Sequence, residues 1–148
     1  MSSDPSLAGG EEEIRRLLAA YQQYQAQSEA IAQQLGLTQM TIQGLDRAIL
    51  AIDALDSATD GQEMLVPIGS GSFVFAKLAS KERVVLNVGA GVSIEKPAAE
   101  ARESLKIRKA EVAEASKKLS EMLNKIDAEM AKIQSVISEY ETGTEQVV

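Results

Sequence analysis

The chain has 148 residues, a formal net charge of −7 at pH 7, and neither cysteine nor histidine. Without these two residue types it offers no disulfide, no soft metal site, and no imidazole or thiolate for catalysis. It also lacks a stripe of basic residues that could bind phosphates. We therefore expect no enzyme, no cofactor, no metal and no nucleic-acid partner.

Residues 1–10 contain Pro5, Gly9 and Gly10 and are expected to form a flexible leader. They lack the charged start and apolar core of a signal peptide, and no apolar run in the chain approaches the roughly 18 residues of a membrane span. The sequence thus predicts a soluble, cytoplasmic protein without membrane contacts. The glutamates at positions 11–13 suit the positive end of a helix dipole.

A first coiled-coil arm is predicted over residues 11–57, because apolar residues recur there at heptad positions a and d without a break. Gly61 is suited to the left-handed position just past the end of this helix. With Ile14 as position a, the a and d residues are Ile14, Leu17, Tyr21, Tyr24, Ser28, Ile31, Leu35, Thr38, Ile42, Leu45, Ile49 and Ile52.

A small β head is predicted over residues 58–97, where the apolar pattern changes to a period of two. Gly69-Ser70-Gly71 and Gly89-Ala90-Gly91 predict hairpin turns rather than phosphate loops, because neither continues as GxGxxG and neither opens a helix. The expected strands cover residues 64–68, 72–78, 84–88 and 92–96.

The predicted head needs other subunits, because one four-stranded sheet cannot cover its own two apolar faces and has two free edges. We therefore expect the head to be the oligomerisation surface of the protein. The residues that we expect to contribute are Leu65, Val66, Ile68, Phe73, Val74, Phe75, Val84, Val85, Leu86, Val88, Val92 and Ile94.

A second arm is predicted over residues 98–141, after Pro97, and a flexible tail over 142–148, after a stop at Thr142 and Gly143. Its length nearly matches that of the first arm. We therefore expect the arms to pair antiparallel, as a rod with the head at the bend and both termini at the other end. The second arm's a and d residues are Ala98, Ala101, Leu105, Arg108, Val112, Ala115, Leu119, Met122, Ile126, Glu129, Ile133, Val136 and Tyr140.

The flanking e positions of the two arms indicate that the two ends of the rod differ. Near the head, Asp46 and Asp53 are expected to face Arg102 and Lys109, and these opposite charges favour the antiparallel pairing over other registers. Toward the free end the same edge becomes apolar, and the tyrosines of both arms lie there too. This edge is formed by Leu18, Leu123, Met130 and Ile137.

An apolar edge with tyrosines and a methionine is typical of a surface for adaptable contacts, although the tyrosines alone are also explained as fillers of a and d positions. The expected binding residues at the free end are Ile14, Leu17, Leu18, Tyr21, Tyr24, Met130, Ile133, Val136, Ile137 and Tyr140.

The head and its borders resemble the α-type subunit of the prefoldin family. The segment 64–73, MLVPIGSGSF, is similar to the first hairpin of that class, and the segment 84–96, VVLNVGAGVSIEK, is similar to its second hairpin, leading into Pro97. Two hairpins rather than one distinguish the α type from the β type. The resemblance covers about residues 11–141, and the simple composition is closer to archaeal members.

The resemblance implies an α+β fold, a long antiparallel two-helix coiled coil with a small two-hairpin head, whose heads assemble into a β-barrel in a hexamer of two α-type and four β-type subunits. It also implies a chaperone that captures unfolded client proteins with the coil tips and delivers them to a group II chaperonin without ATP. A coiled-coil tether or adaptor without client holding is the alternative. A small-molecule enzyme is a weaker rival, because no set of residues forms a concave polar site.

Overall fold

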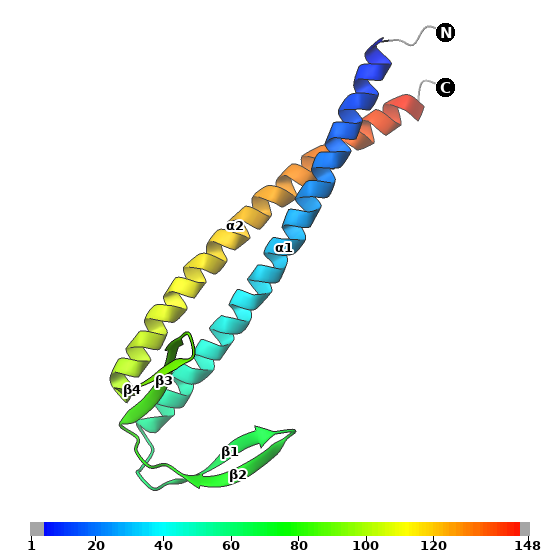
Figure 1. Ribbon diagram of the computed structural model, residues 1–148. Helices are drawn as coiled ribbons and strands as arrows, with labels where there is room; N and C mark the ends of the chain where they lie inside the picture. Colours follow the sequence, from blue (N-terminus) through cyan, green and yellow to red (C-terminus); the bar gives the residue numbers. More distant parts are fainter. Residues whose placement is uncertain (1–4, 146–148) are drawn as a thin grey trace. The chain divides into compact units, whose positions relative to one another are not determined.

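A computed structural model describes residues 5–145 and shows two long helices separated in sequence by two β-hairpins (Figure 1). This arrangement confirms the predicted α+β class. The elements are helix α1 (Pro5–Leu55), strands β1 (Glu63–Gly69), β2 (Ser72–Lys77), β3 (Arg83–Gly89) and β4 (Val92–Pro97), and helix α2 (Ala98–Glu145).

The chain divides into two compact units, and each is described by itself. The head unit, residues 40–113, holds the end of α1, both hairpins and the start of α2. The terminal unit joins residues 1–39 with 114–148 and is described over 5–39 and 114–145.

Helix α1 begins at Pro5, earlier than the predicted start at residue 11, so part of the expected leader is helical. Proline is well tolerated in a first helical turn, because its missing N–H would have no partner there. A Cβ atom at Gly10 would lie 3.1 Å from Cε2 of Tyr140, so the two helices approach closely at this glycine. Because α1 begins at Pro5, the glutamates at 11–13 do not occupy its first turn. Residues 1–4 lie outside the described part.

Helix α2 continues to Glu145, past the predicted stop at Thr142 and Gly143. The Thr142 hydroxyl donates to the carbonyl of Ser138 at 2.8 Å, one helical turn earlier. A single glycine lowers helix propensity by only about 1 kcal/mol relative to alanine, which is too little to end a long helix. Residues 146–148 of the predicted tail lie outside the described part.

The connection from α1 to β1 differs from the prediction in one detail. Helix α1 already ends at Leu55, and Gly61 lies in the turn that follows. Gly61 does adopt a left-handed conformation, with φ of 83°. Its N–H donates to the carbonyl of Leu78 at 2.6 Å. Gly61 therefore shapes the base of the first hairpin and does not cap the helix.

The two hairpins share one geometry. In the first turn Ser70 and Gly71 have φ of 50° and 72°, and in the second turn Ala90 and Gly91 have φ of 52° and 74°. Positive φ at both central residues is the mark of a type I′ turn, whose twist matches that of the flanking strands. The sequence-based prediction of hairpin turns is therefore confirmed, and the strand bounds agree within one residue.

The four strands form two separate two-stranded sheets, β1 with β2 and β3 with β4, rather than the single sheet that we predicted. The segment between β2 and β3 is hydrogen-bonded to the loop before β1. Leu78 N–H donates to Gln62 O at 2.9 Å, and Lys81 N–H donates to Asp60 Oδ1 at 2.8 Å. Each small sheet therefore keeps two strand edges unpaired within the chain.

The core of the head unit joins both helices and the second hairpin. Leu45 and Ile52 of α1 pack with Ala101 and Leu105 of α2, and Val84 and Leu86 of β3 pack against this cluster. Burying an aliphatic side chain of this size contributes roughly 1.5–3 kcal/mol. The core therefore fixes the antiparallel pairing of the helices in this unit and seats β3 and β4 on them.

The predicted heptad register is confirmed for α1, where every predicted a and d position is buried or half-buried. For α2 the predicted a positions are confirmed, but the d positions that follow Ala101 in the sequence are wrong, because they are exposed. Met122 and Val136 are 50% and 44% exposed, and Glu129 is exposed too. Their places are taken by the next residue in each heptad, and these inward residues are Lys109, Ser116, Leu123, Met130 and Ile137.

The shift has a physical cause in the two rows of side chains. The predicted d row contains Arg108 and Glu129, whose charges would lose their hydration in a core without gaining a partner. The next row offers the larger apolar residues Leu123 and Ile137 in the terminal unit. Near the head it offers Lys109, which finds a carboxylate on α1.

Candidate assembly and client-binding surfaces

An ion-pair seam joins α1 and α2 in the head unit. Lys109 Nζ lies 2.6 Å from Asp46 Oδ1, and Arg102 Nε lies 2.6 Å from Asp53 Oδ1. The Arg102 Nε–H is not aligned for a hydrogen bond, so the second contact is an ion pair only. The predicted pairing of Asp46 and Asp53 with Lys109 and Arg102 is confirmed.

The sequence analysis missed a further member of the seam. Arg102 Nη2 donates to Asp56 Oδ2 at 2.8 Å, so one guanidinium bridges Asp53 and Asp56. Asp53 lies in the last turn of α1, and Asp56 lies three residues later in the turn that directly follows the helix, so both carboxylates reach the same guanidinium. That spacing was the available signal. The Arg102 side chain is only 23% exposed, which makes it the best shielded charge of the seam.

Replacing Arg102 by Met is expected to lower the free energy of unfolding by about 1–3 kcal/mol, because two charge-assisted contacts are lost. Lys109→Met should cost less than about 1 kcal/mol, because that pair is nearly half exposed. Urea unfolding followed by circular dichroism measures both. The matched control is Lys106→Met, an exposed residue of α2 outside the seam. Equal losses for Arg102→Met and Lys106→Met would show that the bridge adds nothing.

The hairpins expose most of the residues that were predicted to assemble. Phe75 and Val85 are 77% and 69% exposed. Neighbours such as Leu65 and Val66 point to opposite faces of β1, yet both are exposed, so neither face of this hairpin is covered. Val84 and Leu86 are half-buried against the helices. The other exposed members are Ile68, Phe73, Val74, Val88, Val92 and Ile94.

The predicted client-binding residues all lie in the terminal unit, but they do not form one apolar edge. Ile133 is buried, and Leu18 and Val136 are exposed, at 45% and 44%. Of the predicted apolar edge only Leu18 is exposed, because Leu123, Met130 and Ile137 are half-buried, although Ile137 does lie beside Leu18. The half-buried members are Ile14, Leu17, Tyr21, Tyr24, Met130, Ile137 and Tyr140.

Apart from Leu37, which is 65% exposed, the large exposed apolar residues of the terminal unit lie on two flanks of the helix pair. On one flank, Leu18 and Tyr21 line a shallow pocket of about 210 Å³ with Gln134 and Ile137. On the other flank, α2 exposes Val136 and also Met122, two heptads away on the same row. Met122 was missed as a surface residue because its row had been assigned to the core.

Within residues 5–145 no group of three or more acidic, histidine or cysteine side chains is placed to hold a metal ion. None of the helices in that part of the chain has an apolar stretch that is long enough to cross a membrane. The features that remain are the seam, the exposed hairpins and the apolar flanks of the terminal unit.

Two long helices joined through two exposed hairpins define a class of protein, namely two-helix chains with a β-hairpin head. Comparison with known proteins identifies the family. The model of the prefoldin subunit family matches residues 10–142. The chain belongs to the prefoldin family.

Curated relatives from archaea agree with this assignment. The prefoldin subunit alpha of Methanothrix thermoacetophila is 61% identical over 110 residues, which cover 74% of this chain and 72% of the relative. That of Methanococcoides burtonii is 36% identical over 127 residues, covering 86% and 92%. The resemblance to archaeal α-type subunits is thus confirmed.

A solved structure supports the fold as well. The filamentous PFD from Methanocaldococcus jannaschii, determined by cryo-electron microscopy, superposes with a TM-score of 0.67 and 26% identity. The match covers 82% of this chain and 98% of that one. Family membership gives the chain the general chaperone role of prefoldins and a place in an oligomeric prefoldin assembly.

Proposed function

We propose that the chain is a subunit of an ATP-independent holdase, which captures unfolded proteins and delivers them to a group II chaperonin in the cytoplasm. In this proposal it works in a hexamer of two α-type and four β-type subunits, and its hairpins help to form a β-barrel. The observation that carries the proposal is the exposure of apolar residues on both hairpins, Phe75 and Val85 above all, in a chain of the prefoldin family.

The assembly part of the proposal rests on surface chemistry. A soluble monomer rarely exposes as much apolar surface as the uncovered residues of the two hairpins would make. Unpaired strand edges in the same hairpins add open backbone donors and acceptors. Subunits that pair along these edges would satisfy the backbone and bury the apolar side chains in one step.

The client-holding part rests on the two apolar flanks of the terminal unit. A flank exposes only a few apolar side chains, and each contributes at most about 2 kcal/mol when a client covers it. One subunit would therefore hold a client weakly. Several subunits that act on one unfolded chain raise the effective concentration, so that holding is firm while each contact stays quickly reversible. Reversible contacts suit a carrier that must release its client.

A tether or adaptor is the alternative use of such helices. It would need a specific partner along the helices and would give the exposed hairpins no role. Holding of many unfolded clients distinguishes the two, because a tether has no reason to protect an unrelated denatured enzyme.

The proposed function predicts suppression of aggregation without nucleotide. The chain mixed with a β-type subunit should form a hexamer by mass and keep a denatured enzyme soluble, equally with and without Mg-ATP. Calorimetry should show no heat of ATP binding. Protection that requires ATP, or a complex that assembles yet gives no protection, would contradict the proposal.

A further inference from the structure

The loop before β1 makes a tight turn around Asp60 and Gly61. Gln62 N–H donates to the carbonyl of Thr59 at 3.0 Å, and Thr59 N–H donates to Gln62 Oε1 at 3.1 Å. Gly61 is the third residue of this turn and has φ of 83°. A type II turn requires a positive φ at its third residue, and glycine adopts it without steric cost. The fold therefore favours a glycine directly after Asp60.

The same two residues bind the linker between the hairpins, residues 78–82. Gly61 N–H donates to the carbonyl of Leu78 at 2.6 Å, and Lys81 N–H donates to Asp60 Oδ1 at 2.8 Å. We call these two hydrogen bonds the clasp. They join the start of the first hairpin to the segment that leaves it, so the clasp closes the base of that hairpin.

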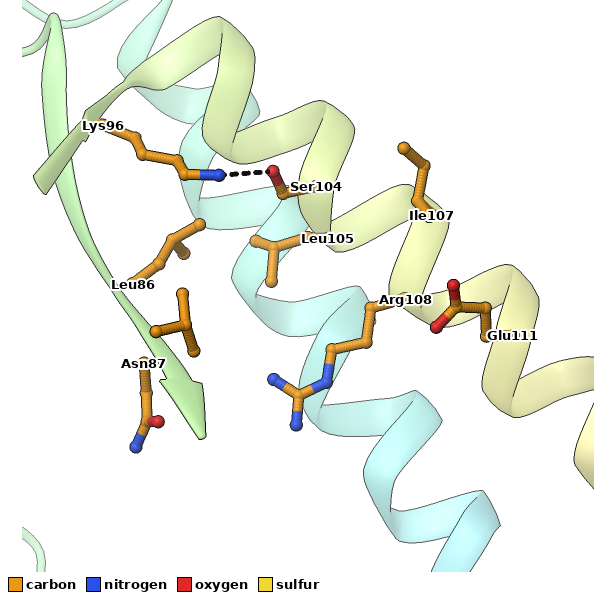
Figure 2. Close-up of a pocket in the computed structure, with 9 residues that line it drawn as sticks. Leu86, Asn87, Lys96, Ser104, Leu105, Ile107, Arg108 and Glu111 are labelled. Carbon is orange, nitrogen blue, oxygen red and sulfur yellow. Dashed lines mark hydrogen bonds between the residues drawn. The ribbon is translucent and has the colours of Figure 1, made fainter. Parts of the chain in front are cut away.

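The second hairpin has further support from helix α2. Lys96 Nζ donates to the Ser104 hydroxyl at 3.2 Å, and Leu86 of β3 lies beside Leu105 of α2 (Figure 2). A side-chain hydrogen bond and an apolar contact thus seat this hairpin on the helix independently of the clasp.

The first hairpin is supported less well. Within the described residues, neither β1 nor β2 contributes a side chain to the core cluster of the head unit. A cavity of about 260 Å³ lies between the base of this hairpin and the end of α1, with Met64 on the hairpin side and Ala51 and Ala54 on the helix side. The clasp is therefore a main attachment of the first hairpin to the rest of the head unit.

Asp60-Gly61 is also the one Asp-Gly sequence in the chain, and this sequence has a chemistry of its own. The backbone nitrogen of the glycine can attack Cγ of the aspartate, because glycine has no Cβ to hinder the approach. The new N–C bond closes a succinimide ring, and a carboxyl oxygen leaves as water with the amide proton. Water then opens the ring at either carbonyl, and opening at the former main-chain carbonyl gives isoaspartate.

The clasp occupies both reacting groups. The N–H of the attacking nitrogen of Gly61 is donated to Leu78, and the carboxylate of Asp60 accepts from Lys81. Both bonds must break before the nitrogen can reach Cγ, so ring closure requires a local opening of the base of the hairpin. Asp60 and Gly61 are exposed, so water can reach a ring once it has formed.

From this geometry we infer that Asp60-Gly61 is a latent isomerisation site, which the clasp protects in the folded chain. Isomerisation inserts Cβ and Cγ of Asp60 into the main chain and leaves the former main-chain carbonyl as a free carboxylate. The acceptor for Lys81 N–H then no longer stands in its place, so the reaction unfastens the base of the first hairpin. The co-reactant is water, and the inference does not depend on the proposed function.

Peptide mapping tests the inference by measuring isoaspartate at position 60 after the full chain is incubated warm at neutral pH. Lys81→Pro removes the amide proton that Asp60 accepts, whereas Lys81→Ala keeps it and is the matched control. Isoaspartate should form about tenfold faster in Lys81→Pro than in wild type, because one protecting hydrogen bond is lost. Lys81→Ala should match wild type. Hydrogen exchange of the Gly61 amide reports the clasp itself and should be fast in Lys81→Pro alone.

A second variant tests the protection without a proline. Asp60→Asn keeps an Oδ1 acceptor and closes the same ring with loss of ammonia, which changes the mass of the peptide. Its reaction should be at least about tenfold slower in the folded chain than in urea, because the clasp must open first. Equal rates in the folded chain and in urea would overturn the inference. Equal formation of isoaspartate in Lys81→Pro and Lys81→Ala would overturn it too.

Discussion

Val85→Asp and Phe75→Asp are each expected to leave the chain unable to enter the complex while its helices stay folded. Both side chains are largely exposed in the single chain, at 69% and 77%, so an aspartate there costs little before assembly. In a subunit interface the same carboxylate would be desolvated without a partner, at a cost of several kcal/mol. Sedimentation of the mixture with β-type subunits measures assembly, and circular dichroism measures helix content.

The matched control for this experiment is Leu50→Asp. Leu50 is 67% exposed and lies in the same head unit, but on helix α1 rather than on a hairpin. It should assemble normally if the hairpins carry association. Should Val85→Asp and Phe75→Asp both sediment as the full complex, assembly does not depend on the hairpin faces.

The features of the fold that could be predicted from the sequence are those set by local pattern. The a and d positions of α1 predicted its inward face correctly, because no charged residue occupies them. The Gly-x-Gly turns gave both hairpins, because few other sequences allow positive φ at consecutive positions. The ion pair of Asp46 with Lys109 could be predicted from their opposite charges, because the antiparallel register brings the two residues together.

The sequence pattern could not predict which of two adjacent heptad positions of α2 faces α1. In α2 two adjacent rows are both partly apolar, and the choice between them depends on what α1 presents. Asp46 and Asp53 make Lys109 and Arg102 acceptable beside the core, and this favours the row that also contains Met130 and Ile137. The sequence-based choice weighed α2 alone and therefore misplaced the apolar edge of the terminal unit.

The separation of the hairpins was missed for a similar reason. Strand pattern predicts strands but not which strands pair, and the linker between β2 and β3 is hydrogen-bonded to Asp60 and Gln62. Those contacts join residues that are distant in sequence and carry no periodic signal. The consequence for function is large, because two separate hairpins offer more unpaired edges to other subunits than one sheet would.

The shifted register also changes how client holding should be tested. Met130 and Ile137 face the partner helix, so making them polar would weaken the helix pair itself. The exposed side chains of the two flanks are Leu18 on one and Met122 and Val136 on the other. A variant with all three changed to Gln should keep its helix content and its place in the complex.

Client holding is expected to fall sharply in that triple variant, by about tenfold in the client affinity of each arm, because its exposed apolar contacts are removed. A shorter chain without residues 1–20 and 132–148 should lose holding further, while the seam and the head core remain. The readout is aggregation of a denatured enzyme, measured in a complex whose β-type subunits are also shortened, since their contacts would otherwise mask the loss. The control is Met40→Gln with Leu50→Gln, which removes two apolar residues of the head unit that are more exposed than the three test residues. An assembled complex that protects the enzyme as well as wild type after both changes would show that these flanks do not hold the client.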